Sequence, residues 1–70
     1  MKKVYFLNKK GERILINNNI NSYEEGYELI YSYLKDNNYK SYYQRIIPIE
    51  NGFSIDFGSY SEFFEIVEEK

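Results

Sequence analysis

The side chains that could do acid–base chemistry in this sequence are carboxylates, lysines, arginines and tyrosines only. The chain has no histidine and no cysteine, so it lacks the commonest general base and the thiolate ligands of metal sites. Two carboxylate pairs, Glu24 with Glu28 and Glu62 with Glu65, have spacings that specify neither a glycosidase nor a metal site. The four glycines are scattered and form no phosphate-binding loop. We therefore expect a protein that is not an enzyme and uses no cofactor and no metal.

Acidic residues are concentrated towards the end of the chain. Residues 1–45 carry 8 basic and 5 acidic groups, whereas residues 46–70 carry 1 and 6. Acids mixed with aromatic side chains can face a basic, nucleic-acid-binding surface of another protein and act as a decoy. Solubilising charges on strand edges and on a tail explain the same acids. The residues that we predict to bind a partner protein are Asp56, Ser59, Tyr60, Glu62 and Glu65.

Residues 39–45 interleave tyrosines with basic groups, as do surfaces that stack single-stranded bases. Tyr42, Tyr43 and Arg45 would form this surface. Further charge would come from the first two strands if they lie nearby, through Lys2, Lys3, Lys9, Lys10 and Arg13. A net charge of −2 is not the basic footprint that a nucleic-acid binder usually has. Strand tyrosines packed inward account for the same residues. Nucleic acid is therefore the alternative partner and not the expected one.

The longest predicted element is an amphipathic helix over residues 22–38, which must position everything else. Ser22 and Glu25 have the spacing of a capping box, in which each side chain accepts a hydrogen bond from the backbone amide of the other residue. Asn37 and Asn38 tolerate the left-handed conformation in which helices end. The apolar face of this helix is predicted to consist of Tyr23, Gly26, Tyr27, Ile30, Tyr31, Tyr33 and Leu34.

Gly26 on that apolar face has two interpretations. Without a side chain it would let the helix approach a sheet closely. Alternatively it is an ordinary glycine that costs the helix about 1 kcal/mol relative to alanine.

Five short segments of alternating apolar residues predict strands, at residues 4–7, 12–16, 42–47, 53–57 and 62–67. Residues 8–11 predict a turn in which Gly11 takes a positive φ, residues 17–19 a loop, and Asn51 with Gly52 a hairpin turn. Pro48 either ends the third strand or places it at a sheet edge. The order ββαβββ predicts a single α+β domain over residues 1–70, with one helix packed on a mainly antiparallel sheet.

The segment IDFGSYSEFFEI, residues 55–66, resembles a C-terminal hairpin pattern of small accessory proteins from phages and mobile elements of low-GC Gram-positive bacteria. The resemblance implies a short, non-enzymatic protein that binds a host protein and changes its activity, in some cases by inhibiting a host-defence nuclease. An abundance of Asn, Lys, Ile, Tyr and Phe without any Ala or Thr also indicates an A+T-rich genome. A structural turn, with Asp56 bonded to amides near Gly58, explains the same residues.

The longest uninterrupted apolar run is residues 4–7, which is too short for a transmembrane span or the core of a signal peptide. We therefore expect a cytoplasmic protein without a membrane partner.

Apolar residues on both faces of the predicted strands indicate self-association. A single helix can shield only one face of a sheet, and the other face would expose more apolar area than soluble monomers usually tolerate. We predict a two-fold homodimer, the commonest closed assembly. A host partner could cover the same face instead. Three functions follow: a protein–protein interaction module acting on a host protein, which is preferred, a single-stranded nucleic-acid binder, and a structural homo-oligomer.

Overall fold

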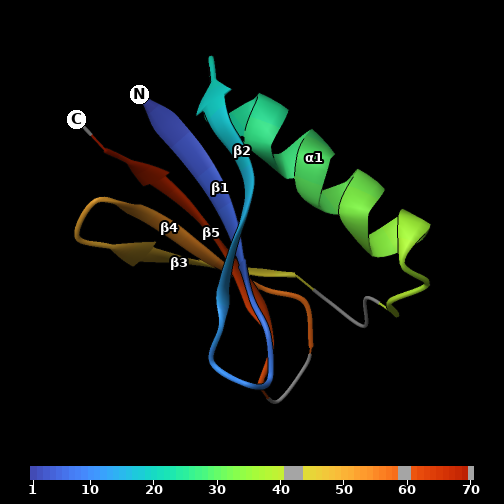
Figure 1. Ribbon diagram of the computed structural model, residues 1–70. Coiled ribbons are helices and arrows are strands. Elements are labelled where there is room, and N and C mark those ends of the chain that lie inside the picture. The colour runs from blue at the N-terminus through green and yellow to red at the C-terminus, as the bar shows by residue number, and fades with distance from the viewer. Residues whose placement is uncertain (41–43, 59–60, 70) are drawn as a thin grey trace.

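The computed structural model describes residues 1–40, 44–58 and 61–69, which form one helix and five strands (Figure 1). Every strand pairing among these residues is antiparallel, and the strand order in the sheet is β2-β1-β5-β4-β3. The predicted α+β class and the order ββαβββ are confirmed. Along the chain the elements are β1 (Lys2–Leu7), β2 (Arg13–Ile20), α1 (Tyr23–Asp36), β3 (Arg45–Ile49), β4 (Gly52–Asp56) and β5 (Phe63–Glu68).

The first and last strands lie side by side in the middle of the sheet, so the two chain ends are neighbours (Figure 1). β5 pairs with β1 on one side and with β4 on the other. The sheet is therefore complete only when the last strand pairs both with β4, which precedes it in the chain, and with β1 at the other end of the sequence.

α1 begins and ends with the predicted signals. The Ser22 Oγ accepts a hydrogen bond from the Glu25 N–H at 3.2 Å. The second predicted bond of the capping box, from the Ser22 N–H to the Glu25 carboxylate, is wrong. The Glu25 carboxylate instead accepts a hydrogen bond from the N–H of Asn21, at 3.1 Å. At the other end Asn38 has a φ of 57°, and the N–H groups of Asn38 and Tyr39 donate to the carbonyls of Lys35 and Leu34. These two bonds form a Schellman motif.

A narrow stripe of α1, formed by Gly26, Ile30 and Leu34, is buried against the sheet. The sheet residues beneath it, which include Val4 and Ile66, lie on one face of β1, β4 and β5. Tyr31 was predicted to belong to the apolar face, but its side chain is 57% exposed. A helix lying on a sheet buries only the stripe nearest the strands, and Tyr31 projects from its flank.

β2 is longer than predicted, because residues 17–19 continue the strand instead of forming a loop. Irregularities in the pairing with β1 add residues to β2: Val4 is opposite Asn17, whereas Tyr5 is opposite Leu15. Bulges of this kind keep exposed asparagines in the strand while Ile20 still reaches the core, where it is 3% exposed.

β3 lies at the edge of the sheet and includes Pro48. Of the two predicted alternatives for Pro48, the edge position is therefore confirmed. The third strand begins at Arg45 in the described residues, and residues 41–43 lie outside them. The predicted hairpin is present, but its turn is one residue earlier, because Ile49 pairs with Gly52 across the turn. A Cβ at position 52 would overlap the carbonyl oxygen of Ile66 in β5. Gly52 is therefore needed for close approach of two backbones and not for a positive φ.

Gly26→Ala is expected to lower the free energy of unfolding by about 1 kcal/mol. An added Cβ would lie 2.8 Å from Ile66 Cδ1 and 3.0 Å from Ile20 Cδ1, and both isoleucines are enclosed in the core. Overpacking costs typically 1–3 kcal/mol, more than the roughly 1 kcal/mol that alanine adds to helix stability. Urea unfolding of both proteins measures the difference.

The matched control for this substitution is an Ile66→Val background, which removes the nearest methyl group. There the same Gly26→Ala change should cost less or become stabilising. A stabilising effect in the original background would show that Gly26 is not retained for close packing.

Candidate interaction surface

The face of the sheet opposite α1 is the largest feature of the fold that could contact a partner. Cross-strand pairing places Leu15, Tyr5, Glu65, Ser54 and Ile47 in one row that crosses all five strands. α1 contacts the other face, and no second helix of the described chain covers this row. We refer to the surface formed by this row and its neighbours as the open face.

Apolar side chains lie at both ends of the row. Leu15 is 48% exposed on β2, and Ile47 is 41% exposed on β3. Between these ends, Leu7 is directly opposite Phe63, and both side chains are half-buried. Val67 belongs to the same face, since it is opposite Lys3, but it is only 1% exposed. The open face is thus a mixture of exposed and partly covered apolar groups.

Charged side chains form a connected network over the centre of the open face. The Arg13 guanidinium lies 3.7 Å from the centre of the Tyr5 ring, and its Nη2 is 3.3 Å from Glu65 Oε1. The Tyr5 hydroxyl donates to Glu69 Oε1 at 2.9 Å, and Lys3 Nζ lies 3.6 Å from the same oxygen. Exposed ion pairs contribute little stability singly, but the network holds the aromatic and guanidinium groups in defined positions.

These contacts shift two pKa values in opposite directions. The hydrogen bond from Tyr5 lowers the pKa of Glu69, and the positive charge of Lys3 lowers it further. The same hydrogen bond, followed by burial and the negative charge of Glu69, raises the pKa of Tyr5. The phenol is therefore neutral and acts as the donor across the neutral pH range.

The predicted partner-binding residues do not all share one surface. Asp56 and Glu65 lie on the open face, on β4 and β5. The Asp56 Oδ1 also accepts a hydrogen bond from the Gly58 N–H at 2.9 Å, and Gly58 has a φ of 98°, so the structural turn is present. Glu62 lies instead on the side of the sheet that faces α1. Ser59 and Tyr60 are outside the described residues.

Of the predicted nucleic-acid surface, only Arg45 is described. It is the first residue of β3, is exposed and lies opposite Asp56. Tyr42 and Tyr43 fall outside the described residues.

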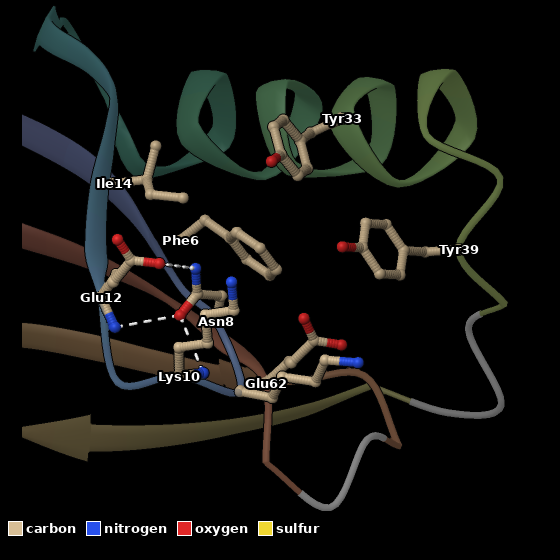
Figure 2. A pocket seen from close by; sticks show the side chains of 9 residues that line it. Phe6, Asn8, Lys10, Glu12, Ile14, Tyr33, Tyr39 and Glu62 are labelled. Carbon is tan, nitrogen blue, oxygen red and sulfur yellow. Dashed lines mark hydrogen bonds between the residues drawn. The ribbon is translucent and has the colours of Figure 1, made fainter.

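Glu62 lines a pocket of about 270 Å³ between the C-terminal end of α1 and the β1–β2 turn (Figure 2). The Schellman motif turns Tyr39 back against the helix, so that its ring stacks with that of Tyr33 at 6.4 Å between centres. On the opposite side Asn8 holds the turn, because its Oδ1 accepts the N–H groups of Lys10 and Glu12. Burial and the negative charge of Glu62 raise the pKa of Tyr39.

Neither the Tyr5 network nor the pocket is indicated by local patterns in the sequence. Arg13 and Glu65 are 52 positions apart, and Tyr5 and Glu69 are 64 positions apart. Such contacts depend on strand order, which no local pattern in the sequence indicates. The stacking of Tyr39 on Tyr33 could have been inferred, because a hydrophobic contact across a Schellman motif is common.

Within residues 1–40, 44–58 and 61–69, no helix is long and apolar enough to cross a membrane. No three acidic residues in that part of the chain are grouped so that they could hold a metal ion. The chain matches no protein-family model, no curated protein and no solved structure. Its function is therefore inferred from its own surface chemistry.

Tyr5→Phe is expected to raise the pKa of Glu69 towards the ordinary value, since the hydrogen bond from Tyr5 is the main cause of its depression. Because the pKa of Glu69 is lower in the folded state, its contribution to stability is present above the unfolded pKa and is lost as the pH falls through the folded pKa. The variant should lose less stability on acidification. NMR titration of the Glu69 carboxyl carbon measures the shift.

Tyr31→Phe is the matched control, because the Tyr31 side chain is 57% exposed on the helix. This variant should leave the Glu69 titration unchanged. An unchanged Glu69 pKa in Tyr5→Phe would contradict the hydrogen-bonded network on the open face.

Proposed function

We propose that this protein is a non-enzymatic interaction module that binds another protein through its open face. The observation that carries the proposal is the row across the sheet, in which exposed Leu15 and Ile47 lie at the two ends and Tyr5 lies between them, with the Arg13 guanidinium over its ring. Tyrosine and arginine are the residue types that most often anchor interfaces, and apolar side chains around them exclude water.

The composition of the open face favours a partner that binds reversibly. Interfaces of permanent dimers resemble a domain core cut in half and are poor in charge. Here Lys3, Arg13, Glu65 and Glu69 lie over the centre, in ion pairs that are satisfied without a partner. Self-association, which the sequence predicts, is the competing use of the same face.

The resemblance of residues 55–66 to phage accessory proteins supports a particular kind of partner. A short phage protein without catalytic groups acts by occupying a host protein. We therefore propose a host protein in the cytoplasm of a Gram-positive bacterium as the partner, with a defence protein as the first candidate.

Single-stranded nucleic acid is the second candidate ligand, because the structure brings Lys9 and Lys10 to the same pocket as Tyr39. These lysines would add positive charge beside Tyr39, whereas Tyr42 and Tyr43 lie outside the described residues. Glu12 and Glu62 line the same pocket, however, and would repel a phosphate backbone. Binding to nucleic acid should weaken steeply with salt, so a gel shift at low salt tests it.

Ile47→Asp is expected to reduce capture of the partner about tenfold or more, because truncated interface anchors typically cost more than 1 kcal/mol. The experiment is a pull-down with the tagged protein from a Gram-positive host lysate. The captured protein is identified and its affinity for each variant is then measured.

Ile46→Asp is the matched control. Ile46 precedes Ile47 in the same edge strand, is similarly exposed at 49% and points to the opposite face. Both variants change the net charge equally, so only the face differs. Equal loss in the two variants, or the absence of any stoichiometric partner, would contradict the proposal.

A further inference from the structure

The pocket beside Tyr39 is built from aromatic rings at its inner end and charged side chains at its rim (Figure 2). The Phe6 ring is 2% exposed and lies 5.2 Å from the Tyr33 ring and 5.8 Å from the Tyr39 ring, measured between ring centres. These rings belong to β1, to α1 and to the segment after α1. Their positions are therefore fixed by the core and by the helix end.

The most buried charged side chain that lines the pocket is negative. Figure 2 shows the Glu62 carboxylate pointing towards the space between Phe6 and Tyr39, and the Tyr39 hydroxyl pointing into the same space. Glu62 is half-buried, whereas Lys9 and Lys10 are exposed on the turn. Burial raises the pKa of Tyr39, and the negative charge of Glu62 raises it further.

A carboxylate beside aromatic faces favours a cation with an apolar stem. The negative faces of tyrosine rings attract a guanidinium or ammonium group, and the carboxylate accepts its hydrogen bonds. Arginine suits this chemistry better than lysine, because its planar group both stacks on aromatic rings and donates to a carboxylate. A phosphate or carboxylate ligand would instead have to approach Glu62.

We propose that this pocket binds the side chain of an arginine from the partner protein, with the guanidinium beside Glu62 and the stem against Tyr33 and Tyr39. The assignment of the occupant to a protein rests on the function proposed above, whereas the preference of the pocket for a cation does not.

The pocket and the open face meet at one end of the sheet. Asn8, Glu12 and Glu62 line the pocket, and each is the chain neighbour of an open-face residue, namely Leu7, Arg13 and Phe63. A protein that covers this end of the open face can therefore reach the pocket with a long side chain.

An NMR titration of the full-length protein tests the preference of the pocket for a cation. N-acetyl-arginine amide should shift the backbone amides of Asn8, Tyr39 and Glu62, with a dissociation constant on the order of 1 mM. N-acetyl-norleucine amide, which has a similar stem without the charge, should bind at least about tenfold more weakly. Inorganic phosphate should produce no shifts at these amides.

Glu62→Gln should weaken binding of the arginine amide about tenfold, because it removes a charge-assisted hydrogen bond. Glu28→Gln makes the same change in net charge on the exposed side of α1, outside the pocket, and should leave binding unchanged. Lys9→Gln should leave binding unchanged or tighten it. Equal binding of the norleucine amide, shifts with phosphate, or equal weakening by Glu28→Gln would each overturn the proposal.

Comparing capture of the partner by the Glu62→Gln and Ile47→Asp variants tests this inference separately from the proposed function. If Glu62→Gln retains full capture while Ile47→Asp loses it, the open face alone binds the partner and the arginine assignment is wrong. If both variants lose capture, both surfaces contact the partner. If Ile47→Asp retains capture, the proposed function fails, and the titration still decides the ligand preference of the pocket.

Discussion

The constraint on which the surface of this protein depends is the packing of α1 on a single face of the sheet, which is closest at Gly26 and Ile66. An added Cβ on Gly26 would lie 2.8 Å from the end of the Ile66 side chain, so the helix can rest this close only because position 26 has no side chain. Ile66 itself is fully buried in the central strand β5. A chain of this size buries a limited fraction of its surface, and this one commits its only described helix to one face.

The position of α1 determines which face of the sheet is left to contact solvent. With α1 on one face, the other face has to be made compatible with water by its own side chains. The Arg13 guanidinium over the Tyr5 ring, its ion pair with Glu65, and the ion pair of Lys3 with Glu69 place charge over apolar groups. The result is a surface of tyrosine, arginine and exposed aliphatic side chains beside ion-paired lysine and glutamate side chains.

Local signals in the sequence predicted the elements and their order. Ser22 and Asn38 mark the ends of α1, and Gly11, with a φ of 83°, supplies the positive φ expected in the first turn. Signals that depend on distant partners were misread. Gly52 looked like a turn residue next to Asn51, yet its role is to admit the backbone of β5. The strand order was not predicted, because it depends on β5 pairing with β1 at the far end of the chain.

The candidate site was predicted only in part for the same reason. Glu62 and Glu65 are close in sequence, but Glu65 lies on the open face of β5, whereas Glu62, which directly precedes β5, lines the pocket on the side of α1. Asp56 and Glu65 share the open face because β4 and β5 are neighbours, which was not known from the sequence. Tyr5 was not predicted as a site residue, and Arg13 was expected only to add charge to a nucleic-acid surface, since neither lies near the acidic segment along the chain.

The central claim is that the open face is free in the isolated protein and available to a different protein. Sedimentation equilibrium of the pure protein across micromolar concentrations tests it most directly. The account predicts a single species of 8.5 kDa at every concentration, because the charges over the open face are satisfied without a second copy. A mass that rises with concentration to that of a dimer, and that Ile47→Asp returns to the monomer value, would contradict it.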